Sequence, residues 1–141
     1  MKFAQYQLLK EHALAACQAE SGACLKEIDA KQMNPIVLAY IGDVVFSMYV
    51  RLRLLPASSH VRVLNDLGMK YVSAVCQCLA MESLESGLTE EERQVFQRGR
   101  NAKSTVPKSA SVHQYRMATA FEALLGYLYL EEQQERLEEL L

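Results

Sequence analysis

The chain has 141 residues, a formal net charge of −2 and 23% charged residues. This length suits one compact domain with a real hydrophobic core, and the composition is that of an ordinary globular protein. Three prolines and six glycines are few for the turns of an all-β fold, so we expect an all-α fold. No uninterrupted apolar run reaches roughly 20 residues and no signal peptide is evident, so we expect no membrane span.

The four cysteines are Cys17, Cys24, Cys76 and Cys78. They lack the paired C-x-x-C spacing that is typical of structural zinc sites. Reduced thiols in a cytoplasmic protein are therefore the main interpretation, and a zinc site is the minor alternative.

The small net charge hides an uneven distribution along the chain. No acid occurs between Glu92 and Glu122, and that interval contains six cations: Arg93, Arg98, Arg100, Lys103, Lys108 and Arg116. The rest of the chain therefore carries −8. Such a split indicates a locally basic surface rather than a globally basic protein.

The first two expected helices lie in the N-terminal half of the chain. Apolar periodicity over 1–20 predicts a helix that serves packing or a dimer contact. Asn34 as N-cap and Pro35 at the first helical position predict the start of a second helix, with a strand as a weaker possibility. Its apolar stripe is Val37, Ile41, Val44, Met48, Leu52 and Leu55. Because this helix is apolar on several sides, we expect it to be central in the domain.

The remaining elements follow from caps and breakers. One helix is predicted over 61–81, with these side chains inward: Val61, Leu64, Leu67, Tyr71, Val75, Cys78 and Leu79. Thr89 and Glu92 have the spacing of a capping box, so another helix begins there and ends near Gly99. Turn-forming residues predict a loop over 100–114, and a last helix runs from Tyr115 into an acidic continuation.

Two of these helices carry an isolated acid in an apolar run. Asp43 follows Gly42, and Glu122 lies one turn before Gly126. An unpartnered buried carboxylate is costly, so for a single acid a helix cap or an ion pair with Arg116 is the favoured interpretation. Two acids in matched settings, near an acid-free basic segment, favour instead a shared Mg²⁺ site that assists cleavage of a phosphodiester.

Three segments in this order resemble a known family. The stretch from Tyr40 through Asp43 resembles the signature motif of ribonuclease III, and the stretch around Glu122 resembles its second acidic motif. Residues 38–43, 98–104 and 119–130 together resemble the Mini-ribonuclease III branch, a nuclease domain without an appended double-stranded-RNA-binding domain. The likeness begins near residue 29, which leaves 1–28 as an N-terminal helical extension and 29–141 as the catalytic domain.

The resemblance implies an all-α homodimer that cleaves double-stranded RNA with Mg²⁺, for which Mn²⁺ can substitute. Its expected task is maturation of the large-subunit (23S) ribosomal RNA precursor in the cytoplasm, with a ribosomal protein or the pre-ribosome as a further candidate partner. Asp43 and Glu122 match the family's catalytic, metal-binding acids. Thr119 and Ala39 stand where the wider family has acids, and Ser47 stands where both branches usually have glutamate. Thr119 and Ser47 are expected to bind waters around the metal.

The substrate surface is expected to be basic, because A-form RNA is recognised mostly through its phosphates and 2′-hydroxyls. The candidate RNA-binding residues are Arg98, Arg100, Asn101, Lys103, Lys108, Arg62 and Lys70. The dimer contact is expected on the helix around Val44, Met48 and Leu52. The alternatives are a catalytically inactive RNA-binding or ribosome-associated protein on the same fold, and a helical interaction module with no role on RNA.

Overall fold

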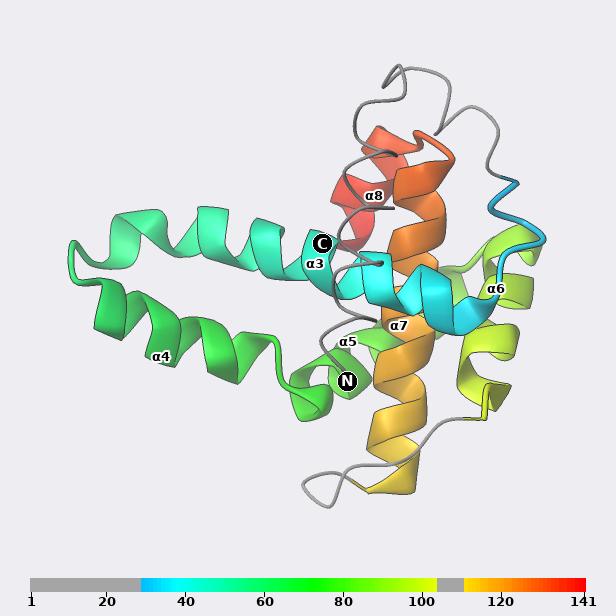
Figure 1. Ribbon diagram of the computed structural model, residues 1–141, viewed down its shortest axis with the longest axis horizontal. Coiled ribbons are helices and arrows are strands. Elements are labelled where there is room, and N and C mark those ends of the chain that lie inside the picture. The colour runs from blue at the N-terminus through cyan, green and yellow to red at the C-terminus, as the bar shows by residue number, and fades with distance from the viewer. Residues whose placement is uncertain (1–28, 104–110) are drawn as a thin grey trace, which may run out of the picture.

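The computed structural model describes residues 29–103 and 111–141, and every regular element in these ranges is helical. This confirms the all-α prediction. The elements are α3 (Pro35–Leu54), the short 3₁₀ turn η1 (Leu55–Ala57), α4 (Val61–Tyr71), α5 (Ala74–Leu84), the 3₁₀ turn η2 (Glu85–Gly87), α6 (Glu90–Asn101), α7 (Val112–Leu130) and α8 (Gln134–Leu140) (Figure 1). The expected helix over 1–20 lies outside the described residues, as do Cys17, Cys24 and Lys108.

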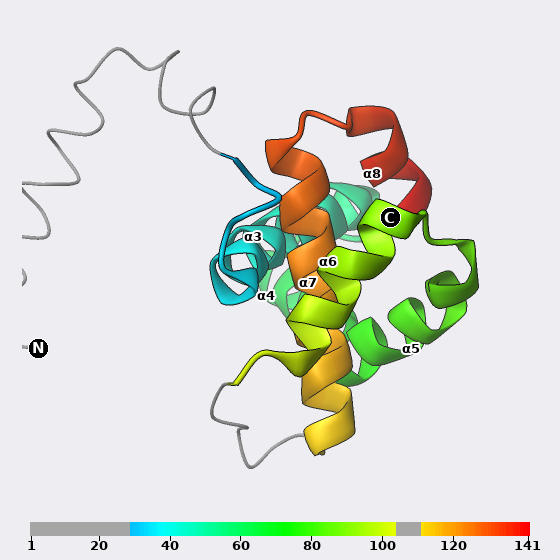
Figure 2. The same ribbon diagram turned by 90° about the vertical axis from the view of Figure 1, so that its right-hand side faces the viewer.

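The centre of the fold is α7, around which α3, α5 and α6 pack (Figures 1 and 2). Between Met117 and Leu128, every residue of α7 except Glu122 is buried. The helix is apolar on all sides because all of its sides meet other helices. The prediction that α3 is central is therefore wrong: α3 buries only Leu38, Ala39, Gly42 and Val45.

Two glycines let the backbones of α3 and α7 touch where they cross. A Cβ placed on Gly42 would lie 1.7 Å from the carbonyl oxygen of Glu122, and one on Gly126 would lie 2.0 Å from that of Leu38. Only a residue without a side chain fits at either position. The crossing places Asp43, which directly follows Gly42, beside Glu122.

A third glycine serves α6 in a similar way. A Cβ on Gly99 would lie 2.9 Å from the Cα of Ala120 in α7. The helix ends at Asn101, two residues beyond Gly99, which agrees with the predicted end near Gly99. The absence of a side chain at Gly99 also allows the close packing against α7.

Side-chain caps mark the N-termini of four of the α-helices in the described residues: α3, α5, α6 and α7. The Asn34 side chain accepts a hydrogen bond from the Ile36 N–H at 2.9 Å, which confirms the predicted start of α3. The predicted helix over 61–81 is wrong as a single element, because it breaks into α4 and α5. The Ser73 side chain accepts a hydrogen bond from the Cys76 N–H and caps α5.

The predicted loop over 100–114 is too long at both ends, because α6 reaches Asn101 and α7 begins at Val112. Ser111 and Gln114 form a reciprocal capping box that starts α7 three residues before Tyr115. Because Ser111 and Gln114 lie in a run of turn-forming residues, the sequence predicted a loop there. In the structure the two residues cap a helix.

The C-terminal half of α3 and the whole of α4 form an arm that projects from the body (Figure 1). Only Gly68 of α4 is buried. Several side chains predicted to point inward are exposed instead: Val61, Tyr71, Val75 and Leu79. Most of the predicted α3 stripe is exposed as well: Val37, Val44, Met48, Leu52 and Leu55. Helical periodicity identified an apolar side correctly but could not say what covers it.

By length and mean hydropathy alone, the segment Pro35–Ala57 is long and apolar enough to cross a membrane, although Asp43, Arg51 and Arg53 interrupt its apolar residues. One such helix is weak evidence for a membrane protein, because helices packed in a protein core pass the same test. Here α3 packs against α7 through its buried side, and it carries Asp43 midway along its length.

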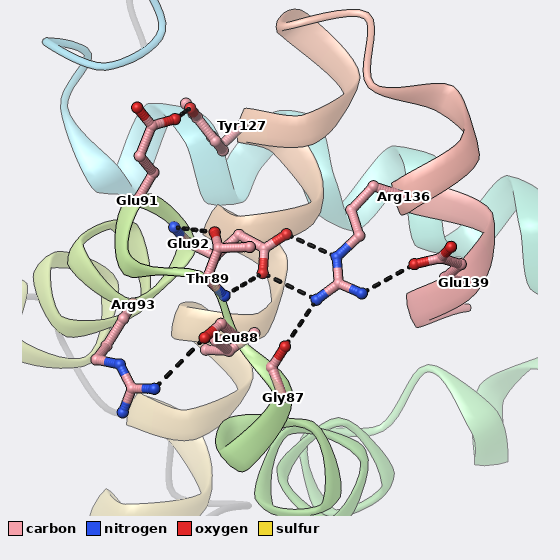
Figure 3. A network of polar contacts seen from close by, with 9 residues as sticks. All are labelled: Gly87, Leu88, Thr89, Glu91, Glu92, Arg93, Tyr127, Arg136 and Glu139. Atoms are coloured by element: carbon pink, nitrogen blue, oxygen red, sulfur yellow. Dashed lines mark hydrogen bonds and ion pairs between the residues drawn. The ribbon is translucent and has the colours of Figure 1, made fainter.

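A buried ion pair ties the C-terminal helix to the body (Figure 3). Arg136 of α8 donates from Nε to Glu92 Oε1 at 2.7 Å and from Nη2 to Glu92 Oε2 at 3.0 Å. Glu92 also accepts the N–H of Thr89 at 2.8 Å, which completes the capping box predicted for α6. Glu92 is 3% exposed, and both of its carboxylate oxygens accept hydrogen bonds.

Candidate active site

The two isolated acids meet where α3 crosses α7. Asp43 is exposed at the surface of α3, and Glu122 is half-buried on α7. Burial raises the pKa of Glu122 to about 7, and the nearby charge of Asp43 adds to the rise. The structure thus brings together the two residues that the sequence singled out from positions 79 apart in the chain.

Neither acid has the structural role considered from the sequence. Asp43 lies in the interior of α3, so it is not a helix cap. Within 29–103 and 111–141, no ion pair includes Glu122, and Arg116 is exposed without a salt bridge to it. A carboxylate this buried and without a cation is poised to receive one from outside the chain.

A third polar group, Gln77, lies at this site and was not predicted from the sequence. It comes from α5, is 1% exposed, and its Nε2 has no hydrogen-bond partner among the described residues. The amide lies near Glu122 and lowers the pKa of that carboxyl against the larger effect of burial, although no hydrogen bond of normal geometry joins the two side chains. An unsatisfied buried amide costs about 1–3 kcal/mol, so its retention beside an acid suggests a role in the site. The one feature of the sequence that could have pointed to Gln77 is that it is a single glutamine among the apolar residues of 74–81.

This donor set fits a hard divalent cation. Carboxylate oxygens are the ligands that Mg²⁺ prefers, and the ion commonly takes one or two of them together with water and substrate phosphates. Asp43 and Glu122 supply the carboxylates, and the Gln77 amide can hold one oxygen of Glu122 while the other remains available. The residues present therefore fit the metal that the sequence predicted.

The two hydroxyls predicted near the metal have different surroundings. Thr119 is buried, and its Oγ1 donates to the Tyr115 carbonyl at 2.9 Å within α7. Ser47 lies one turn after Asp43, and both line an open hollow of about 500 Å³ along the outer side of α3. Ser47 thus shares a surface with Asp43, while the hydroxyl of Thr119 is already engaged.

The candidate RNA-binding residues form two groups. Arg98 donates to the carbonyls of Lys31 and Met33, so it holds the segment that leads into α3. Arg100 is exposed, with its guanidinium 6.0 Å from the ring centroid of Phe96. Asn101 and Lys103 are exposed at and after the end of α6.

The second group lies on the arm. Arg62 and Lys70 are exposed on α4, which Figure 1 shows on the far side of α7 from α6. In one chain the two basic groups therefore flank the crossing of α3 and α7, where Asp43 and Glu122 lie.

The sequence of this helical fold matches a known family of nucleases. The sequence pattern described as "Ribonuclease III domain" matches residues 36–133, from the first turn of α3 to the end of α7 and just beyond. The chain belongs to the ribonuclease III family and is an endoribonuclease of that family.

Its relatives place it within one branch of the family. It is 46% identical to "Mini-ribonuclease 3" of Clostridium tetani, over 80% of this chain and 77% of that protein. It is 47% identical to "Mini-ribonuclease 3" of Enterococcus faecalis, over 80% of this chain and 89% of that protein. A crystal structure of a Fusobacterium nucleatum protein matches with a TM-score of 0.74 and 28% identity, over 77% of this chain and 90% of that one. The resemblance drawn from the sequence motifs is confirmed.

Proposed function

We propose that the protein cleaves double-stranded RNA with Mg²⁺, and that Asp43 and Glu122 hold the ion and are the catalytic residues. The observation that carries this proposal is the half-buried Glu122, which has a raised pKa, no ion-pair partner among the described residues, and Asp43 beside it. Such a site is costly to the fold without a ligand and becomes favourable once a cation binds.

The proposed reaction is hydrolysis of a phosphodiester. Water attacks phosphorus in line with the leaving 3′-oxygen, which gives a 5′-phosphate and a 3′-hydroxyl. When bound, Mg²⁺ or Mn²⁺ would supply a Lewis acid that withdraws charge from the phosphate and favours the attack of water. Asp43 and Glu122 provide the negative charge that holds the ion, and Gln77 orients Glu122. Ser47, which lines the same hollow as Asp43, is proposed to order water around the ion. Thr119 is proposed to do so through the acceptor sites of Oγ1, because its hydroxyl proton is donated to the Tyr115 carbonyl.

RNA binding is proposed for the exposed polar residues on both sides of the site. These are Arg100, Asn101 and Lys103 at the end of α6, Arg62 and Lys70 on α4, and Lys108 in the segment outside the described residues. Arg98 is proposed to support this surface by holding the backbone before α3. Flexible cations suit the phosphates and 2′-hydroxyls of an A-form duplex.

A homodimer would cover the apolar side of α3 and place two sites on one duplex. Five large side chains along this side are 46–60% exposed: Val37, Val44, Met48, Leu52 and Leu55. Exposed apolar stripes of this kind usually mark an interaction surface. A two-fold axis would also give two cuts, one on each strand.

The proposed biological substrate is the 23S ribosomal RNA precursor in the cytoplasm, within or near a pre-ribosome. The names of the relatives support a ribonuclease, and this more specific assignment follows the sequence resemblance.

The test is to incubate the full chain with long double-stranded RNA, with and without Mg²⁺, and to measure binding and cleavage separately. Cleavage that requires the metal supports the proposal. Binding without cleavage supports the inactive RNA-binding alternative, to which the serine at position 47 lends some weight. If the protein neither binds nor cleaves the RNA, the proposal is overturned, and a helical interaction module is the remaining alternative.

A further inference from the structure

A second group of metal-ligating side chains lies outside the site described above. Cys78 and Glu82 are one turn apart on α5, and His113 lies in the first turn of α7. Cys78 Sγ lies 3.5 Å from Glu82 Oε1, and His113 Nε2 lies 3.0 Å from the same oxygen. All three candidate donor atoms lie within 4.8 Å of one another.

These donors differ in chemistry from the pair at the helix crossing. Thiolate, imidazole and carboxylate together are the ligands of Zn²⁺, which binds them in tetrahedral geometry. Zinc–ligand bonds of about 2.0–2.3 Å place neighbouring donor atoms of a tetrahedron about 3.3–3.5 Å apart. The two separations to Glu82 Oε1, 3.5 Å from Cys78 Sγ and 3.0 Å from His113 Nε2, are close to that spacing.

We propose that Cys78, Glu82 and His113 form a Zn²⁺ site that joins α5 to the start of α7. Three protein ligands leave the fourth tetrahedral position to water. Zinc binding converts the Cys78 thiol to a zinc-bound thiolate and releases its proton to solvent. Cys78 is 4% exposed and Glu82 and His113 are exposed, so the ion reaches the site from the solvent side.

An ion bound here would link two helices of the fold. His113 is separated from the described end of α6 by the 104–110 segment, and a bound ion would fix the first turn of α7 against α5. The same helix α5 carries Gln77, the residue next to Cys78, beside Glu122. Zinc here would therefore hold in register the two helices that carry Gln77 and Glu122, without contacting the substrate.

The experiment uses the full chain, freed of metal and kept reduced, with Co²⁺ as a spectroscopic substitute for zinc. Binding to a thiolate produces a sulfur-to-cobalt charge-transfer band in the near ultraviolet, which the two carboxylates at the helix crossing cannot produce. Zinc affinity is measured in parallel by competition with a chromophoric chelator. The variants are C78S and H113N, with C76S as the matched cysteine control and D43N/E122Q as the control for the other site.

The proposal predicts one cobalt ion per chain with the charge-transfer band in the wild type, in C76S and in D43N/E122Q. C78S is expected to lose the band, and both C78S and H113N are expected to lose zinc affinity on the order of 100-fold. Helical circular dichroism checks that each variant is folded. Absence of the band in the folded wild type, its persistence in C78S, or its loss in C76S would overturn the assignment. Unchanged zinc affinity in H113N would show that His113 is not a zinc ligand.

Discussion

Glu92 and Glu122 are two carboxylates in the interior of one small fold, and their surroundings are opposite. Glu92 receives two hydrogen bonds from Arg136 and one from the Thr89 backbone, and the guanidinium holds its pKa below the ordinary value (Figure 3). Glu122 has no ion pair within the described chain, and burial raises its pKa to about 7. A carboxylate whose partners come from its own chain stabilises the fold, and one without them is available to a ligand.

The largest effect is expected where the backbone creates the Glu122 site. Gly42→Ala would place a methyl group 1.7 Å from the carbonyl oxygen of Glu122, and neither backbone can yield without separating α3 from α7. We expect the free energy of unfolding to fall by about 4 kcal/mol or more in chemical denaturation.

Gly68→Ala is the matched control, because its Cβ would meet only a Leu54 methyl at 3.9 Å. Since alanine favours a helix over glycine, this variant is expected to be stabilised by about 0.5–1 kcal/mol. Similar losses in both variants would show that the close crossing is not what limits position 42.

The pH dependence of stability should have opposite signs for the two carboxylates. The folded state keeps a proton on Glu122 up to about pH 7, whereas the unfolded chain loses it near 4.5, so the free energy of unfolding falls as pH rises between these values. The loss amounts to about 3 kcal/mol without metal. E122Q does not titrate, and subtracting its denaturation curves from those of the wild type isolates this effect. A difference that does not vary between pH 4.5 and 7 would contradict the raised pKa.

Glu92 contributes in the other direction. Its lowered pKa gives stability that is present above the ordinary carboxyl pKa and is lost as pH falls below it. E92Q removes one partner of the Arg136 pair, and we expect a loss of about 2 kcal/mol at pH 7 that shrinks toward pH 3. Thermal denaturation across this pH range measures it, and a loss that grows on acidification would refute the assignment.

The sequence predicted Thr89 beside Glu92 and Asp43 beside Glu122. It did not predict the second neighbour of either carboxylate, Arg136 or Gln77. The Thr89–Glu92 capping box is local and was readable from spacing, whereas Arg136 lies 44 residues further along the chain. Asp43 and Glu122 stood out as isolated acids, and family motifs paired them. The roles of Gly42, Gly99 and Gln77 depend on which helix packs against them. Helical periodicity predicts which side of a helix is apolar, but it does not predict which other helix covers that side.

The smallest effect on stability is expected at Gln77. Q77L removes a buried amide whose Nε2 has no hydrogen-bond partner, so the fold should be unchanged or stabilised by about 1 kcal/mol. Cleavage of double-stranded RNA should nevertheless slow by about tenfold if, as proposed, the Gln77 amide orients Glu122 once the metal is bound. The two effects are measured on the same preparation, by denaturation and by single-turnover cleavage. A wild-type rate in Q77L would leave Gln77 without a role in the site.

The most direct test compares single-turnover cleavage of double-stranded RNA by E122Q and E92Q, in saturating Mg²⁺ and at a temperature where both are folded. Each variant replaces one interior carboxylate by an amide of nearly the same size. E122Q is predicted to lose on the order of 1,000-fold in rate, and E92Q to stay within about threefold of the wild type. A wild-type rate in E122Q, or an equal loss in a fully helical E92Q, would contradict the division between a catalytic and a structural carboxylate.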